Sequence, residues 1–182
     1  MRWIEEPYLA LTQGAIVDGV DWGMGENNPL SIVLSNACDI ENSKAEFLIV
    51  AALLPAASTL CESREIFSAA ERDSNATGLT KKQKKSMREL LIKYINNTQV
   101  CRYFFFDPNP VIDADLLLVD FQMVKSINLD DELDYVGQMK QMFTMQMMSR
   151  FVSYTGRVPV DRPEESKINQ YIQELTNGYF EL

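Results

Sequence analysis

Histidine is missing from this chain of 182 residues. Without an imidazole, the chain can form no Ser-His-Asp triad, no Cys-His pair and no histidine-ligated metal site. Any catalysis would have to use carboxylates, arginine, lysine, tyrosine or thiols. This absence excludes more classes of enzyme than any other feature of the composition.

Cysteines and long apolar runs are also scarce. The three cysteines are an odd number and contain no C-x-x-C pair, and the first residues, "MRWIEEPYLAL", lack the apolar core of a secretion signal. This pattern is typical of reduced thiols in the cytoplasm. The main apolar run, "FLIVAALLPAA", is broken by Pro55, well short of the roughly 20 residues that a membrane span needs. We therefore expect a soluble cytoplasmic protein, and no motif indicates a cofactor.

Positive charge is in deficit, because 17 lysines and arginines face 26 aspartates and glutamates, for a formal net charge of −9. A nucleic acid would be repelled overall, so binding would require a local basic patch. One such patch is "TKKQKKSMR" over residues 80–88, which contains Lys81, Lys82, Lys84 and Lys85. The simpler interpretation of these lysines is a solvated helix face.

A second candidate for nucleic-acid binding lies in "VCRYFFF". A strand that carries Arg102, Tyr103 and Phe105 could pair with and stack on a single-stranded nucleic acid. The alternative is that the aromatic residues belong to the core and Arg102 lies beside them at the surface.

The remaining composition is that of an ordinary globular domain, with 46% apolar and 24% charged residues. Aliphatic and β-branched runs predict strands within residues 14–54 and 100–127, joined by short turns. Helical spacing predicts a helical insertion over 58–98 and C-terminal helices over 130–176. The predicted fold class is α+β, a small antiparallel barrel or sheet with helices attached.

Three segments near the N-terminus, "QGAIVDGV", "NPLSIVLSN" and "FLIVAALLPAAS", resemble the PemK/MazF toxin family. The resemblance covers the N-terminal third of the chain. It implies an SH3-like barrel. Members of that family are mostly sequence-specific endoribonucleases that act as dimers and are silenced by an antitoxin.

The chain departs from the catalytic pattern of that family. The family's catalytic arginine precedes the proline of the second strand, where this chain has Asn28. Its catalytic Thr or Ser follows the proline of the third strand by two residues, where this chain has Ala57, with Ser58 one residue later. Without the arginine, the cation that stabilises charge on a transferring phosphate is lost. A diverged nuclease would have to use Arg102 or Arg157 together with Asp39 or Ser58.

The second half of the chain resembles uncharacterised bacterial proteins whose second strand ends in Ser-x-x-Cys-Asp. The segments that carry this resemblance are "RYFFFDPNP", "LLLVDFQMVKSI" and "SRFVSYTGRVPV". By analogy with other barrels of the kind that the N-terminal segments indicate, we expect a toxin–antitoxin or phage-defence context.

Cys38 and Asp39 are candidates for a thiol–carboxylate site. A nucleophilic Cys38 would require a nearby cation or a helix N-terminus, and the adjacent carboxylate disfavours the thiolate. The alternative is that Cys38 is a small buried apolar residue and that the side chain of Asp39 caps a turn.

A set of carboxylates in the predicted turns could gather around a hard cation such as Mg²⁺. The set is Asp18, Asp21, Glu26, Asp39 and Glu41. Their spacing matches no metal-binding loop, and turns are ordinary places for acidic residues, so we predict no metal site.

Methionines are concentrated in one segment, at positions 139, 142, 145, 147 and 148. On a helix they point in more than one direction, so Met142 and Met145 remain as apolar surface beyond the face that enters the core. Flexible thioethers suit adaptable partner surfaces. The C-terminal "GYFEL" adds Tyr179 and Phe180. We therefore expect these four residues to contact a protein partner or a second copy.

The leading prediction is a bacterial binding or regulatory component that works in an oligomer or a complex. The first alternative is a diverged endoribonuclease of the PemK/MazF type, and the second is a nucleic-acid-binding module.

Overall fold

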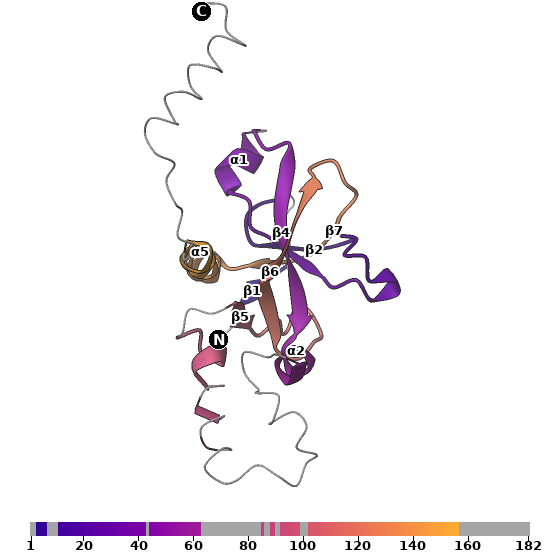
Figure 1. Cartoon of the computed structure of the whole chain (residues 1–182). Coiled ribbons are helices and arrows are strands. Elements are labelled where there is room, and N and C mark those ends of the chain that lie inside the picture. The colour runs from indigo at the N-terminus through magenta and orange to yellow at the C-terminus, as the bar shows by residue number, and fades with distance from the viewer. Residues whose placement is uncertain are drawn as a thin grey trace, which may run out of the picture.

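The computed structural model of the chain describes residues 3–6, 11–42, 44–62, 85, 88–89, 92–98 and 102–156. Seven strands form one antiparallel sheet in the order β1-β7-β2-β3-β4-β6-β5, and the sheet is strongly twisted and curled (Figure 1). The strands are β1 (Ile4–Glu5), β2 (Ala15–Asp18), β3 (Ser31–Val33), β4 (Phe47–Pro55), β5 (Tyr103–Phe106), β6 (Leu117–Asn128) and β7 (Asp134–Met139). The sheet and its helices confirm the predicted α+β class with an antiparallel half-barrel.

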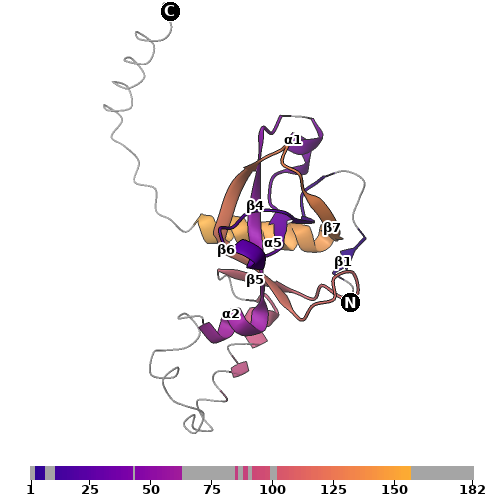
Figure 2. The ribbon, with the colours of Figure 1, turned by 90° about the vertical axis from the view of Figure 1, so that its right-hand side faces the viewer.

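Residues 85, 88–89 and 92–95 are helical. Four further helical elements accompany the sheet within the described residues. They are the 3₁₀ turn η1 (Gly25–Asn27), α1 (Ala37–Glu41), α2 (Ala56–Glu62) and α5 (Gln141–Thr155). Helix α5 crosses the sheet near the middle of β4 and β6, whereas α1 and α2 lie at opposite ends of β4 (Figure 2). No helix in the described ranges has the length and apolar character that would let it cross a bilayer.

Strand β5 shows how the sheet separates two parts of the core. Its four residues, Tyr-Phe-Phe-Phe, are all buried. Successive side chains on a strand point to opposite faces. Phe104 and Phe106 accordingly pack with the residues beneath α5, while Tyr103 and Phe105 pack with residues of α2 on the other face.

Helix α5 approaches the start of β2 closely because residue 14 is glycine. Gly14 has φ of +82°, and a Cβ there would lie 2.5 Å from Oγ1 of Thr144. Only glycine combines this conformation with so little space. Thr144 is buried, and its hydroxyl donates to the carbonyl of Met139 at 3.1 Å. The junction between β7 and α5 is therefore fixed against the sheet.

The prediction of a helix from about residue 130 is wrong over 134–139, where the chain forms β7. This strand pairs with β2 on one side and β1 on the other, so its backbone groups enter ladders that join distant parts of the sequence. Met139, which was counted on the helix, is a fully buried strand residue. The helix that does form begins at Gln141.

One of the connections predicted as short turns, the one between β3 and β4, contains the short helix α1. Asn36 is its N-cap, and its side chain accepts a hydrogen bond from the backbone N–H of Cys38 at 3.1 Å. An Asn cap satisfies one of the free amides at a helix start. The predicted capping role of Asp39 is therefore wrong, because Asn36 has it.

Candidate binding groove on helix α5

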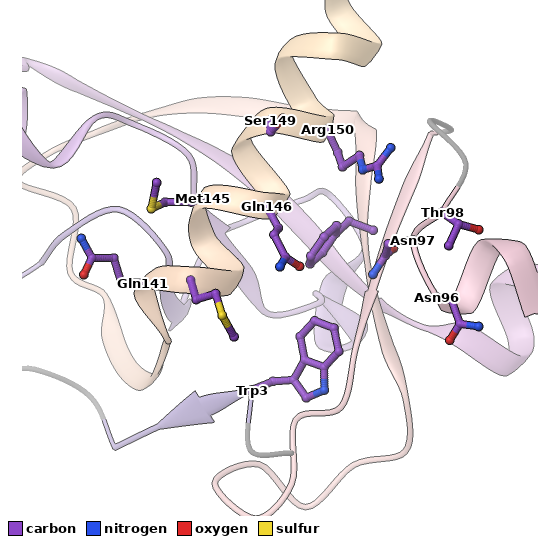
Figure 3. A pocket seen from close by; sticks show the side chains of 11 residues that line it. Trp3, Asn96, Asn97, Thr98, Gln141, Met145, Gln146, Ser149 and Arg150 are labelled. Carbon is purple, nitrogen blue, oxygen red and sulfur yellow. The ribbon is translucent and has the colours of Figure 1, made fainter.

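A groove of about 1010 Å³ runs along the outer side of α5. Its walls are α5, Trp3 at the start of β1, and the segment 96–98, which lies across from the helix (Figure 3). The lining residues are Trp3, Asn96, Asn97, Thr98, Phe104, Gln141, Met142, Met145, Gln146, Ser149 and Arg150. The groove therefore combines apolar groups, neutral amides and hydroxyls, and one guanidinium group.

The indole of Trp3 anchors the floor of the groove. It stacks on Phe143 with ring centroids 4.0 Å apart and meets Phe104 edge to face at 6.3 Å. The carbonyl of Trp3 accepts a hydrogen bond from the N–H of Lys140 at 3.0 Å, next to the first turn of α5. Such aromatic pairs stabilise a contact beyond their buried area, so Trp3 fixes the start of α5 to β5.

The outward face of α5 is nearly free of charge and carries three exposed apolar side chains among neutral polar ones. Met142 is 49% exposed, Met145 is 65% exposed and Val152 is 63% exposed. Arg150 is the only charged residue among the fifteen of the helix. The inward residues Phe143 and Met147 fill the core, as the helical spacing of the sequence requires. The sequence correctly indicated that Met142 and Met145 stay outside the core.

Asn97 holds the wall opposite α5. It has φ of +52°, and its side-chain amide donates to the carbonyl of Phe105 at 2.8 Å while its Oδ1 accepts from the N–H of Phe105 at 2.9 Å. Strand β5 lies at the end of the sheet order, and these two bonds replace the strand neighbour that Phe105 lacks there. Edge strands are prone to pair with other chains unless they are covered. Asn97 therefore fixes the segment 96–98 beside β5 and covers the edge of this strand at Phe105.

A second, smaller recess of about 320 Å³ lies where the family resemblance would place catalytic residues. Asn28 and Pro55 both line it, with Met24, Asn27, Pro29, Leu30, Leu53, Leu54, Ile112, Ala114 and Leu117. The Oδ1 of Asn28 is occupied, because it accepts from the N–H groups of Trp22 at 3.0 Å and of Met24 at 3.1 Å. None of the residues that line this recess is charged.

Ser58 lies on the exposed side of α2 and does not line the recess. Its hydroxyl donates to the carbonyl of Pro55 at 3.3 Å, and the next residue, Thr59, donates to the same oxygen at 2.8 Å. These are local bonds of a helix start. The structure does not bring Ser58 together with Asp39 or Arg102 through any bond among the described residues.

The thiol of Cys38 is exposed and free, so the expectation that it is a buried apolar residue is wrong. The backbone carbonyl of Asp39 accepts from the N–H groups of Lys44 and Ala45, which closes the loop after α1. No histidine exists to act as a base. The described contacts of both residues are therefore structural. Cys38 lies in the first turn of α1, and the carbonyl of Asp39 closes the loop that follows α1.

Arg102 pairs with a buried carboxylate. Its Nε donates to Oδ1 of Asp120 at 2.6 Å, and its Nη2 donates to the second oxygen, while the side chain of Asp120 is fully buried. The guanidinium carbon also lies 5.1 Å from the ring centre of Tyr103. Tyr103 is 4% exposed and Phe105 is fully buried, so the stacking surface suggested for these aromatic residues is not available. The alternative, core aromatics beside an arginine, describes the structure.

The acidic set is dispersed into local turns. Oδ1 of Asp18 accepts from the N–H of Gly19, and Oδ1 of Asp21 accepts from Gly23 at 2.8 Å and from the Asn28 amide at 3.4 Å. These bonds, with the charge of Lys125, lower the pKa of Asp21 below its ordinary value of 3.8. Over the described ranges, no group of three or more Cys, Asp or Glu is placed to hold a metal ion.

Several predicted residues lie outside the described part of the chain. They are Lys81, Lys82, Lys84, Arg157, Tyr179 and Phe180. Lys85 is described and exposed, and its ammonium lies 3.9 Å from the carboxylate of Glu89. Exposed pairs of this kind contribute little to stability.

The sequence pattern does not indicate that Trp3 and Asn97 line a groove. Trp3 stands in a short stretch without clear periodicity. Asn97 acts through hydrogen bonds to β5, and the local sequence does not indicate that pairing. Asn-Asn after an apolar helical stripe was the available signal, since Asn tolerates positive φ at the end of a helix.

The chain is similar in structure to a solved protein complex. It is an endoribonuclease in complex with its cognate antitoxin from a mycobacterial species, with a TM-score of 0.44 and 13% sequence identity over 83% of this chain and 100% of the other. No model of a protein family matches the chain, and no curated protein matches it. No residue role is transferred from the similar structure to this chain.

Proposed function

We propose that this chain is a binding or regulatory component of a protein complex, and that its partner inserts an amphipathic helix into the groove on α5. The observation that carries the proposal is the groove itself, in which the exposed Met142 and Met145 share a lining with Trp3 and no acidic side chain.

The charge distribution supports this assignment. Charged residues make up 24% of the chain but only one of the fifteen residues of α5. The cores of protein interfaces are depleted in charge and enriched in methionine and aromatic residues. A partner would also cover the exposed side chains of Met142 and Met145, which stand in solvent on the chain itself.

The spacing along α5 favours a helix as the partner element. Met142, Met145, Ser149 and Val152 follow one another at intervals of three, four and three residues. This is the spacing at which two helices pack side by side, and a small serine in the middle allows close approach. The helix of fifteen residues is about 22 Å long, which matches three turns or more of a partner helix.

The proposed setting is a toxin–antitoxin or phage-defence complex in a bacterial cytoplasm. This setting rests on the resemblance of the N-terminal third to the PemK/MazF family. The two alternatives, an endoribonuclease and a nucleic-acid-binding module, gain nothing from the described residues, because the Asn28 recess has no charged lining and Tyr103 is buried. Incubation of purified protein with RNA, with and without Mg²⁺, is expected to leave the RNA intact.

Co-purification from the native cell with a tag on the full chain tests the proposal. We expect a partner in a fixed ratio to the wild-type chain, measured by light scattering, and loss of that partner in Met145→Glu. Met24→Glu is the matched control, because Met24 is 46% exposed but lies at the Asn28 recess. A strictly monomeric wild type without a partner, or a Met145→Glu variant that keeps its partner, would contradict the proposal.

A further inference from the structure

A second apolar surface lies away from the groove, on β4 and β6. Phe47 is 54% exposed, Ile49 is 45% exposed and Val124 is 38% exposed. Phe47, Ile49 and Ala51 alternate along β4, so their side chains share one face, and Val124 lies directly opposite Ala51 on β6. We call the exposed residues Phe47, Ile49 and Val124 the sheet patch.

The sheet patch is the uncovered continuation of the surface beneath α5. Ala51 is fully buried in the same cluster as Phe143 and Met147 of α5. Helix α5 crosses at the middle of β4, and the Phe47 end of the strand extends beyond it toward α1 (Figure 2). The sheet therefore buries one part of this face under α5 and leaves Phe47, Ile49 and Val124 in solvent, beside the exposed polar residues Ser126 and Asn128 of β6.

The chain leaves α5 beside this patch. The Nε2 of Gln122 donates to the hydroxyl of Tyr154 at 2.6 Å, which places the last turn of α5 against β6. Gln122 and Val124 are two residues apart on that strand. Phe121 also packs against Phe151 and Tyr154, with ring centroids 5.4 Å and 6.1 Å apart. The last turn of α5 thus contacts β6 two residues from Val124, at the margin of the patch.

We infer that the chain's own residues 163–176 cover the sheet patch. These residues lie outside the described part of the chain, and their sequence predicts a helix that begins at Pro163. Ile168, Tyr171, Ile172 and Leu175 recur at the intervals of one apolar helix face. The opposite positions hold glutamate, lysine, asparagine and glutamine, which suit solvent.

The lengths allow this placement. The six residues 157–162 can reach up to about 20 Å when extended. The patch runs about 13 Å along β4 from Phe47 to Ala51, and a helix of 14 residues is about 21 Å long. A short tether also gives the segment an effective concentration on the order of millimolar at the patch, so it competes well with separate molecules.

Photo-crosslinking of the full chain tests the inference. Phe47 is replaced by p-benzoylphenylalanine, and crosslinked peptides are identified by mass spectrometry after irradiation of a dilute sample. We expect crosslinks within one chain to residues 163–176. The same probe at Tyr135, which is 45% exposed on β7, is the control and should give no such crosslink, because β2 and β3 separate β7 from β4.

Matched variants show whether the apolar face makes the contact. Ile168→Asp with Ile172→Asp should lower the crosslink yield by about tenfold or more, since an unpaired charge is strongly disfavoured in an apolar contact. Asn169→Asp with Gln173→Glu, on the polar side of the same segment, should leave the yield unchanged. Crosslinks only between two copies, crosslinks to a different segment, or equal loss in both pairs of variants would overturn the inference.

Discussion

The groove on α5 and the recess at Asn28 and Pro55 differ in what their side chains are free to do. In the recess, Asn28 stands where the resembled family has its catalytic arginine, and its side chain is hydrogen-bonded to the backbone of its own loop. The remaining lining of the recess is largely apolar. In the groove, Met142, Met145 and the guanidinium of Arg150 line an open space over a fixed aromatic floor. The comparison separates two places: the recess, where the family resemblance would put catalytic residues, has no charged lining, and the groove elsewhere on the fold has the exposed methionines on which the proposed binding role rests.

We expect the largest effect on stability from a substitution of Trp3, which forms the floor of the groove. Trp3→Ala removes the stacking on Phe143 and the edge contact with Phe104, and we expect it to lower the free energy of unfolding by about 2–4 kcal/mol. Partner binding should fail with it. Urea unfolding measures the first effect, and Trp3→Phe should restore most of the stability. If Trp3→Ala were as stable as wild type, the floor would not be the anchor described above.

The wall opposite α5 should give the next largest effect. Asn97→Ala leaves the N–H and the carbonyl of Phe105 without their partners, which should lower the free energy of unfolding by about 1–3 kcal/mol. Asn96→Ala is the neighbouring control, and a surface change of this kind usually stays within about 0.5 kcal/mol. Equal effects of the two substitutions in urea unfolding would show that Asn97 does not hold the edge of β5.

A substitution in the recess should lower the stability of the fold without changing the affinity for the partner. Asn28→Ala removes the acceptor of two backbone N–H groups, so we expect a loss of about 1–2 kcal/mol. The affinity for the partner, measured by isothermal titration calorimetry with the co-purified protein, should not change. A large loss of affinity would move the binding site from the groove to the recess and reverse the comparison.

The smallest effect concerns Asp21, beside Asn28. Its pKa is lowered in the folded state by the N–H of Gly23, by the Asn28 amide and by Lys125. A lowered pKa means that its contribution to stability is present above the ordinary value of 3.8 and is lost as the pH falls through the lower folded-state pKa. Asp21→Asn should therefore slightly flatten the acid limb of the stability curve. An unchanged acid limb in unfolding measurements between about pH 2 and pH 5 would contradict this assignment.

The sequence predicts those parts of the molecule that depend on local pattern. The aliphatic runs of β4 and β6 indicate strands, and the spacing of Phe143 and Met147 identifies the inward face of α5 and leaves Met142 and Met145 outside. Strand β7 was predicted as helix because its register is set by β2, more than a hundred residues earlier in the chain. Neither periodicity nor propensity carries that pairing.

The same limit applies to the site. Trp3 reaches the groove through a ring contact with Phe143, and Asn97 through a bond to the backbone of Phe105. Both contacts join elements whose adjacency only the folded chain defines. The exposure of Cys38 follows from where α1 lies, so its expected burial was wrong, whereas the burial of Tyr103 on β5 agrees with the alternative that the aromatic residues belong to the core.

Methionine oxidation of the co-purified complex tests the central claim most directly. Met24, Met142 and Met145 are exposed to similar degrees on the chain itself, at 46%, 49% and 65%. With dilute peroxide and peptide mass spectrometry, we predict that the partner protects Met142 and Met145 from conversion to the sulfoxide while Met24 oxidises at its unbound rate. Protection of Met24 alone, or equal oxidation of all three with the partner bound, would contradict the assignment of the groove on α5 as the binding site.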